Sequence, residues 1–367
     1  MAGIVRTGIF PEKITPFLRK KMDELIREGG EQSDGYRALA FQYCRSPLEN
    51  EFTSEQNRRH WEAELAVEGG PHALPGLERL YRQSLVIEPT MICAAHCRYC
   101  LRGQYNVFTL TEDELLAIAK YCGNPSVRND LEEVLITGGD PLIVPHRLRF
   151  LVEALVEHAP NIRIVRIGTR LPQQDPDRID NNVYEIFRTH ASDVRFELAT
   201  QINHPVELFP EVTGAFQAFR DLGVTLYSQN VVLKHVNDNE STLVLLYQKM
   251  RELGIEAHYL FHCVPMKGIH HLRTSVAKGL SLAKALTNSG RVSGRVKPMF
   301  AAMTDIGKVT FYDGTILGRD KTNHVLLQTS YRPEERLRWN PNWKMPPTAT
   351  VDGNGYLRVR YLDGEDG

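Results

Sequence analysis

The chain lacks long apolar runs and has no charge excess of one sign. Nowhere do about 18 consecutive apolar residues occur, the length that a membrane helix needs. Residues Met1 to Arg6 lead into no apolar stretch of signal-peptide length. Lys plus Arg number 44 and Asp plus Glu 45, so no overall field would attract nucleic acid or an anionic membrane. We therefore expect a cytoplasmic protein with a small-molecule partner and no nucleic-acid or membrane partner.

Cysteine is also sparse. Six cysteines in 367 residues are too few for a disulfide scaffold. Three of them, however, lie within the eight positions from Cys93 to Cys100. Bridging within this group would leave an odd thiol, so a metal ion or an iron–sulfur cluster explains the crowding better.

The pattern of apolar residues divides the chain into three parts. Residues 1–75 carry helical patterns separated by polar breaks, over Thr15–Glu28, Tyr36–Tyr43 and Thr53–Ala66. In residues 76–290, short β-branched runs alternate with amphipathic helices, which is typical of repeated strand–helix units and a parallel sheet. The predicted strands are Leu85–Glu88, Val134–Thr137, Ile164–Gly168, Arg195–Thr200, Thr225–Val232 and Ala257–Phe261.

The predicted fold class is therefore α/β, a partial (β/α)6 barrel of the TIM type. An N-terminal helical region precedes the barrel, and residues 291–367 form a C-terminal extension that we expect to cover the substrate and cofactors. One helix has a clear start, because Thr111-Glu112-Asp113-Glu114 is a capping box. In such barrels the catalytic groups lie at the carboxyl-terminal ends of the strands.

The cysteine group follows the first predicted barrel strand. In the sequence Cys93-Ala94-Ala95-His96-Cys97-Arg98-Tyr99-Cys100, a tight loop can direct three thiolates to one face of a [4Fe-4S] cluster. The fourth iron is then left without a protein ligand, open to a substrate or cofactor. Three ligands also describe a catalytic zinc site, which His96 could complete.

A second motif follows the next strand. The paired glycines of Gly138-Gly139-Asp140 allow a ligand to approach the backbone closely. Taken alone, such a sequence is more often a turn than a site. Its place one strand after the cysteines favours a site.

The pattern Cys-x-x-x-Cys-x-x-Cys, with Tyr99 before the last cysteine, resembles the signature of the radical S-adenosylmethionine superfamily. The resemblance implies that Cys93, Cys97 and Cys100 hold a [4Fe-4S] cluster whose open iron is chelated by S-adenosylmethionine. Electron transfer, from a donor such as flavodoxin or ferredoxin, would yield a 5′-deoxyadenosyl radical that removes a substrate hydrogen. The segment from Gly138 to Asp140 resembles the Gly-Gly-Glu element of the superfamily, which contacts the cofactor. Tyr99, Gly138, Gly139 and Asp140 are thus predicted cofactor-binding residues.

Further segments resemble, in the same order, the lysine 2,3-aminomutase family over roughly residues 75 to 335. These segments are Cys100-Leu101-Arg102, Ile164-Val165-Arg166-Ile167-Gly168-Thr169-Arg170, Asn203-His204-Pro205, Gln229-Asn230-Val231-Val232-Leu233 and His271-Leu272-Arg273-Thr274. The resemblance implies that Arg102 binds the substrate carboxylate, which its planar fork suits. It also makes Arg170 and Gln229 predicted contacts of S-adenosylmethionine, although ordinary polar capping of strand ends is an alternative for both.

The aminomutases also use pyridoxal phosphate, bound to a lysine that follows a run of glycines. Lys308 lies at nearly the matching place and is therefore a predicted catalytic residue. Only Gly307 remains of the glycine run, and Asp305 would lie unfavourably near a phosphate. Leu80 and Ser84 stand where phosphate-binding arginines are expected. Use of pyridoxal phosphate stays open.

The family's substrate pocket is altered as well. Val264 and Met303 replace the two aspartates that grip the substrate ammonium in lysine-specific enzymes, so this divergent member is not expected to act on lysine. Lys267 and His270 either favour an acidic or polar group in the pocket or are solvated loop residues. The family's C-terminal zinc cysteines are missing, which predicts no structural zinc and, in a homo-oligomer, a different interface.

Three functions are carried forward. The first is a radical enzyme that acts on a free amino acid or an amino-acid-like metabolite, as an amino acid 2,3-aminomutase. The second keeps the radical chemistry without pyridoxal phosphate, as an epimerase, lyase, decarboxylase or dehydrogenase. The third is a non-catalytic iron–sulfur or zinc protein. Because the family resemblance also includes a branch that modifies lysines in proteins, a protein substrate stays open as well.

Overall fold

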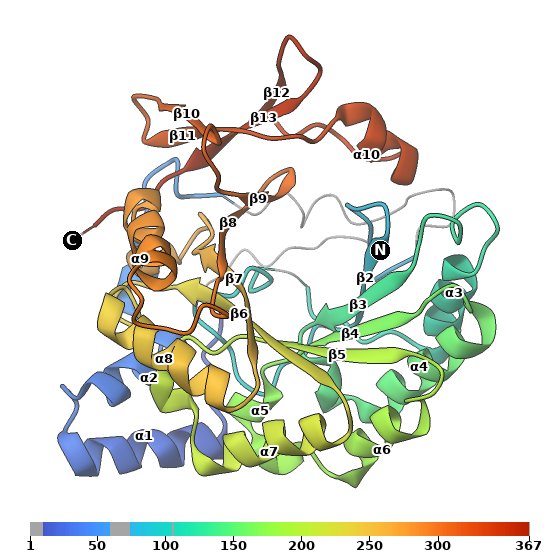
Figure 1. Ribbon diagram of the computed structural model, residues 1–367, viewed down its shortest axis with the longest axis horizontal. Helices are drawn as coiled ribbons and strands as arrows, with labels where there is room; N and C mark the ends of the chain where they lie inside the picture. The colour runs from blue at the N-terminus through green and yellow to red at the C-terminus, as the bar shows by residue number, and fades with distance from the viewer. Residues whose placement is uncertain (1–9, 59–73, 105, 367) are drawn as a thin grey trace.

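A curled sheet of nine strands forms the centre of the molecule, as Figure 1 shows. The computed structural model describes residues 10–58, 74–104 and 106–366. The strands are β1 Leu77–Glu78, β2 Ser84–Thr90, β3 Glu133–Gly138, β4 Ile164–Gly168, β5 Arg195–Thr200, β6 Thr225–Val232, β7 Glu256–His262, β8 Met299–Thr304 and β9 Gly307–Thr310. They pair in sequence order, and β2 to β8 are parallel.

All six predicted barrel strands are confirmed, as β2 to β7. The sheet is wider than predicted, because β8 pairs in parallel with β7 and places Met299 beside Tyr259. The sequence had assigned that segment to the C-terminal extension. Antiparallel β1 and β9 border the sheet at its two edges. The α/β partial barrel is therefore confirmed, with one additional parallel strand.

Helices cover the outer face of the curled sheet. They are α3 Glu112–Cys122, α4 Pro145–His158, α5 Leu171–Gln174, α6 Asn181–Thr189, α7 Pro210–Asp221, α8 Glu240–Glu252 and α9 Val276–Asn288. Short 3-10 turns occur at η3 Pro141–Ile143, η4 Pro176–Arg178, η5 Pro205–Glu207 and η6 His270–Leu272. The capping box at Thr111 is confirmed, since its hydroxyl accepts from the backbone of Glu114, whose carboxylate accepts from Thr111. The helices bury an apolar face against strand residues such as Val165 and Leu198, both 0% exposed.

The N-terminal region packs on this barrel through α1 Pro16–Gly29, α2 Asp34–Tyr43 and η1 Pro47–Asn50. The first two confirm predicted helices. The third prediction, over Thr53–Ala66, is wrong for residues 53–58, which form only turns, and its remainder lies outside the described residues. In this segment Thr53 and Gln56 bond reciprocally: the Gln56 side-chain oxygen accepts from the backbone of Thr53 (2.8 Å), and the Thr53 hydroxyl accepts from the backbone of Gln56 (3.3 Å).

The C-terminal part contains a second sheet. Strands β10 Ile316–Arg319, β11 His324–Gln328, β12 Ala349–Val351 and β13 Leu357–Leu362 form it, with α10 Pro333–Trp339 between β11 and β12. Figure 1 shows it in orange and red along one side of the barrel, opposite α1, α6 and α7. The buried guanidinium of Arg273 ties it down by donating to the backbone oxygens of Cys263, Leu362 and Asp363.

Within the described residues, no helix combines the length and the apolar character needed to cross a membrane.

Candidate active site

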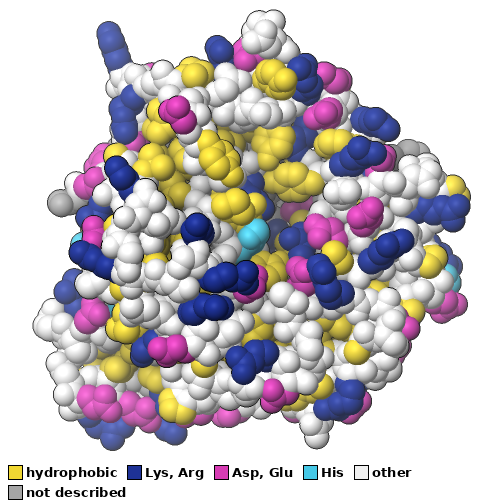
Figure 2. All heavy atoms as spheres, viewed as in Figure 1, with side chains coloured by type: hydrophobic (Ala, Val, Ile, Leu, Met, Phe, Trp, Pro, Cys, Tyr) yellow, Lys and Arg dark blue, Asp and Glu magenta, His cyan; other side chains and the backbone are white. Residues whose placement is uncertain are grey.

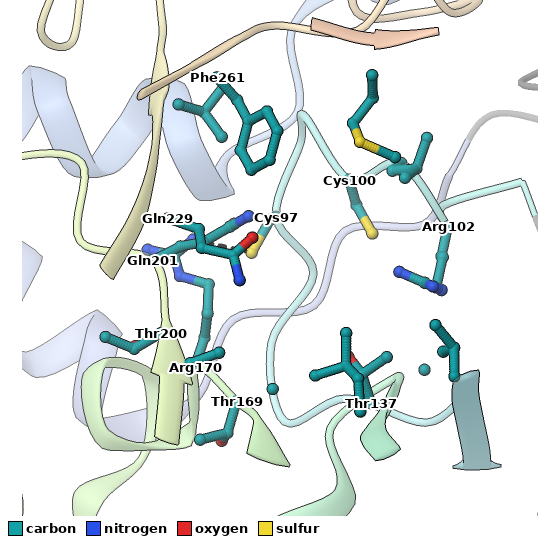
Figure 3. Close-up of a pocket in the computed structure, with 18 of the residues that line it drawn as sticks. Cys97, Cys100, Arg102, Thr137, Thr169, Arg170, Thr200, Gln201, Gln229 and Phe261 are labelled. Carbon is teal, nitrogen blue, oxygen red and sulfur yellow. Dashed lines mark hydrogen bonds between the residues drawn. The ribbon is translucent and has the colours of Figure 1, made fainter. Parts of the chain in front are cut away.

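One cavity collects residues from every strand between β1 and β9. All of the predicted site residues lie along it: Cys93, Cys97, Tyr99, Cys100, Arg102, Gly138, Gly139, Asp140, Arg170, Gln229 and Lys308. The close-up in Figure 3 shows Cys97, Gln229 and Arg170 toward one side of the view, Cys100 and Arg102 toward the other, and Thr137 below them. Segments more than 200 residues apart in the chain thus meet in one site.

The three cysteines of the loop after β2 are only partly exposed. Burial raises the pKa of the Cys93 thiol well above its usual range, and burial followed by the neighbouring Cys97 raises the pKa of Cys100 to about 11. Buried thiols of this kind ionise when a metal centre takes the place of the proton. In the described part of the chain, no group of three or more His, Cys, Asp and Glu side chains is placed to hold a single metal ion. A cluster spreads three thiolates over three irons, which this donor set suits.

The cysteine loop is held from outside by the N-terminal segment. Arg98 is buried, and its guanidinium pairs with Glu49 (2.5 Å) and donates to the backbone oxygens of Phe10 and Pro11. The His96 ring bonds to the Pro11 oxygen (2.7 Å) and stacks on Phe10. His96 therefore points toward the N-terminal segment, which leaves it unsuited to complete a zinc site with the three thiols.

The glycine pair is required by the fold itself. A Cβ on Gly138, whose φ is +103°, would lie 2.5 Å from the Thr90 oxygen, and one on Gly139 would lie 2.2 Å from the Ile92 oxygen. The backbones of the two loops are in contact here, since Gly139 donates to Thr90 (2.7 Å). From the sequence we expected the missing side chains of the glycine pair to let a ligand approach the backbone. In the structure they let the backbone after β2, which leads into the cysteine loop, approach it instead.

Asp140 joins this loop to the one after β4. Its carboxylate accepts hydrogen bonds from the Thr169 hydroxyl (2.8 Å) and from the backbone of Arg170 (2.8 Å) and Leu142 (3.1 Å). Burial raises the pKa of Asp140 to about 6, and these hydrogen bonds oppose that rise. Asp140 thus fixes the relative positions of the two loops that border the cavity.

Arg102 lies in the cavity but is already held by protein carboxylates. Its Nε donates to Glu88 (2.5 Å), and its Nη2 lies 3.6 Å from a Glu78 oxygen. Sequence reasoning missed both glutamates. Both glutamates compete with a substrate carboxylate for the Arg102 guanidinium. Arg102 would therefore bind a substrate carboxylate while it remains paired with these glutamates.

Lys308 reaches the cavity from β9 and lies 4.2 Å from the ring centre of Tyr259. The neighbouring turn is filled: the Tyr81 hydroxyl accepts from the backbone of Lys308 (3.1 Å) and would lie 3.1 Å from a Cβ on Gly307. Asp305 pairs with Arg58 and accepts from Thr348 (2.7 Å), away from the cavity. A lysine thus reaches the cavity, whereas this filled turn stands where the family's glycine run would cradle the phosphate of pyridoxal phosphate.

The wall around Val264, Met303 and Phe261 is apolar. Figure 2 shows apolar side chains gathered on this face of the molecule beneath the C-terminal sheet. Lys267 and His270 do not line the cavity, and Lys267 instead lies over the Phe52 ring. Of the two alternatives for these residues, a place in a loop outside the cavity agrees with the structure.

His262 is a cavity residue that sequence reasoning missed. It is fully buried at the end of β7, where its ring nitrogens bond to the Tyr361 hydroxyl (2.7 Å) and the Thr274 oxygen (2.8 Å). Because a carbonyl only accepts, Nε2 carries the proton and Nδ1 accepts from Tyr361. Burial, followed by the charge of Arg273, lowers the pKa of His262 to about 3.

The depressed pKa gives a testable pH dependence. Between pH 6.5 and 3 the unfolded chain binds a proton at His262 that the folded chain does not, so stability falls as the pH falls. Relative to His262→Gln, whose amide can make both hydrogen bonds, the wild type should lose about 1.4 kcal/mol per pH unit in this window. Urea unfolding of both proteins at pH 7, 6 and 5 measures the difference. Parallel stability curves would contradict the assignment.

Comparison with known proteins agrees with this geometry. Residues 87–246 match the radical SAM superfamily. A putative L-lysine 2,3-aminomutase of Aquifex aeolicus is 32% identical over 303 residues, which cover 80% of this chain and 78% of the relative. The chain belongs to the lysine 2,3-aminomutase family of the radical SAM superfamily. It is therefore a radical SAM enzyme, of a superfamily that uses a [4Fe-4S] cluster and S-adenosylmethionine.

Another relative in the lysine 2,3-aminomutase family is matched over less of its length. The L-lysine 2,3-aminomutase of Clostridium subterminale is 32% identical over 231 residues, 62% of this chain and 53% of that enzyme. Among solved structures, a radical SAM methyltransferase from Sphaerobacter thermophilus covers 61% of this chain and 67% of its own, with 17% identity and a TM-score of 0.44.

Proposed function

We propose that this radical SAM enzyme removes a hydrogen atom from a free amino acid or an amino-acid-like metabolite, without pyridoxal phosphate. One observation carries the proposal: the three thiols, the Gly138 to Asp140 segment and Arg102 line a single cavity beneath an apolar wall. Cys93, Cys97 and Cys100 would hold the cluster. When bound, the cluster and S-adenosylmethionine supply a 5′-deoxyadenosyl radical, which performs the abstraction.

The residues of the chain bind, orient and shield the reactants. Gly138, Gly139, Asp140 and Gln229 are the proposed neighbours of S-adenosylmethionine, while Tyr99 and Arg170 lie behind Cys97. Arg102, shared with Glu88, is the proposed ligand of the substrate carboxylate. The C-terminal sheet, which Arg273 holds in place through a hydrogen bond to the Leu362 oxygen, would exclude water from the cavity.

The cavity favours a substrate without a second ammonium group. Val264 and Met303 line it, and among its described residues the acidic side chains are Glu78 and Asp140. Glu78 lies beside Arg102, and Asp140 is bonded to Thr169. A diamino acid would therefore bury a charge against an apolar wall, which is costly. We expect substrates other than lysine.

A second candidate is an amino acid 2,3-aminomutase with pyridoxal phosphate on Lys308. Its support is that Lys308 reaches the cavity and that relatives carry the aminomutase name. Against it stands the filled turn at Gly307, where the Tyr81 hydroxyl lies against the single glycine that remains of the family's glycine run.

One anaerobic experiment tests the proposal. The protein is reconstituted with iron and sulfide, reduced, and assayed for 5′-deoxyadenosine with pools of L-amino acids, in parallel with and without pyridoxal phosphate. We expect cluster absorbance and substrate-stimulated 5′-deoxyadenosine, equal in both arms. Borohydride reduction followed by peptide mapping should find no more pyridoxyl label on Lys308 than on the exposed control Lys321.

The other outcomes are equally informative. Selective labelling of Lys308, lost in Lys308→Ala, together with a requirement for pyridoxal phosphate would replace the proposal by the aminomutase. A cluster without any cleavage of S-adenosylmethionine, with every pool tested, would favour a non-catalytic iron–sulfur protein. The same assay of 5′-deoxyadenosine also allows an electron donor such as flavodoxin or ferredoxin to be compared with a chemical reductant.

A further inference from the structure

Cys97 differs from the other two cysteines of the loop in having two side-chain donors at its sulfur. Arg170 Nη1 lies 3.0 Å and Gln174 Nε2 lies 3.4 Å from Cys97 Sγ. Both donors are buried, with 8% and 2% of their surface exposed. Gln174 is oriented by the backbone N–H of Ala95, which donates to its side-chain oxygen (3.2 Å). The amide nitrogen of Gln174 is therefore the end that faces the sulfur.

Arg170 is fixed by a buried network of hydrogen bonds and ring contacts. Its Nη2 pairs with Glu207, and its Nη1 also donates to the Tyr99 hydroxyl. Glu207 in turn accepts from the backbone of Asn203 (2.7 Å) and His204 (2.9 Å), which fixes its carboxylate. The guanidinium lies between the rings of Tyr43 (5.4 Å) and Tyr99 (5.6 Å). A guanidinium so constrained cannot turn away from Cys97 without breaking a buried ion pair.

The sequence assigned Arg170 to S-adenosylmethionine. In the structure Arg170 lines the cavity, its guanidinium faces Cys97, Tyr99 and Glu207, and its backbone N–H joins the Asp140 network. Its assignment to S-adenosylmethionine stays a prediction. Figure 3 shows Arg170 rising from the end of β4 toward Cys97 and Gln229.

We propose that Arg170 and Gln174 are positioning residues that raise the reduction potential of the cluster through hydrogen bonds to the Cys97 sulfur. The proposal rests on the proposed function, because it requires a cluster at the three cysteines. Reduction adds one electron, taken from an external reductant, and transfers no proton or group. N–H donors and a nearby cation stabilise the added negative charge. The reduced cluster is therefore stabilised more than the oxidised cluster, which raises the reduction potential. Glu207 offsets part of the Arg170 charge.

This arrangement predicts shifts of opposite sign. Gln174→Leu removes a hydrogen-bond donor, and Arg170→Gln removes the cation. Each substitution should move the reduction potential of the cluster to more negative values. Glu207→Gln removes the opposing carboxylate and should move it to more positive values. A purely structural role would lower the cluster content of all three variants without giving opposite shifts.

The measurement is an EPR-monitored redox titration of the reconstituted full-length protein, without S-adenosylmethionine or substrate. Iron and sulfide contents are determined on each sample, so that only cluster-bearing protein is compared. The matched control is Gln173→Leu: this neighbouring glutamine is equally buried, but it donates to Thr200 (2.7 Å) instead of Cys97. Its potential should equal that of the wild type.

The outcomes separate this inference from the proposed function. Wild-type potentials in Gln174→Leu and Arg170→Gln at full cluster content would overturn the inference and leave the proposed function intact. If Arg170→Gln fails to hold a cluster, Arg170→Lys and Gln174→Leu carry the test. Potential shifts without 5′-deoxyadenosine formation would support the inference and count against the function. A wild-type protein that binds no cluster would overturn both.

Discussion

Replacing any one of Cys93, Cys97 and Cys100 by alanine is expected to abolish cluster binding and 5′-deoxyadenosine formation. Each of the three thiols would hold a separate iron, so removal of one leaves two irons without a protein ligand, counting the iron that is open by design. The expected result is loss of nearly all bound iron and of all measurable cleavage. Iron and sulfide analysis after anaerobic reconstitution measures the first, and chromatography of 5′-deoxyadenosine the second.

The chain offers a matched control for this prediction in Cys44. That cysteine follows α2, is half-buried against the main core and does not line the cavity. Cys44→Ala should retain the cluster and the activity. Full cluster content in any of the three loop variants would contradict the assignment of ligands, and cluster loss in Cys44→Ala would point to a general effect of cysteine replacement.

Gly139→Ala is expected to destabilise the protein by about 3 kcal/mol and to prevent cluster assembly. The new methyl group would lie 2.2 Å from the Ile92 oxygen and 2.6 Å from its carbonyl carbon, both rigid backbone atoms. To avoid this clash, the loop after β3 must move away from the cysteine loop. That movement breaks the hydrogen bond from the backbone of residue 139 to the Thr90 oxygen. Denaturant unfolding of the metal-free protein measures the first effect, and iron content after reconstitution the second.

Gly214 provides the control. It lies within α7, and a Cβ there would meet nothing within 4 Å. Gly214→Ala should stabilise the protein by about 1 kcal/mol, because alanine loses less conformational entropy in a helix. If Gly139→Ala were as stable as Gly214→Ala, the contact between the two loops would not be the reason for the glycine pair.

Much of the barrel could be read from local patterns. The six strands β2 to β7 were found because they are short runs of β-branched, leucine or aromatic residues that alternate with amphipathic helices. The capping box at Thr111 could be found for the same reason, since all of its partners lie within four residues. Strands β10 and β12 of the second sheet were missed because β10 is exposed along its whole length and β12 has three residues, so neither carries a clear alternation of apolar and polar positions.

The site residues divide in a similar way. The sequence identified side chains that share a cavity, from Cys93 to Lys308, by motif and order. It did not identify what those side chains touch. Glu88 and Glu78 beside Arg102, and Glu207 behind Arg170, carry no motif of their own.

By itself the sequence determined the cysteine motif, the glycine pair, and the order of strands and helices. These features depend on residues close together in the chain, or on the fixed rule that parallel strands present their carboxyl-terminal ends at one edge. Only the tertiary structure decided which charges meet. Arg102 pairs with two glutamates, and Arg170 turns to Cys97, because the partners come from other strands and loops. Such pairings depend on distances across the folded barrel, which no local pattern encodes.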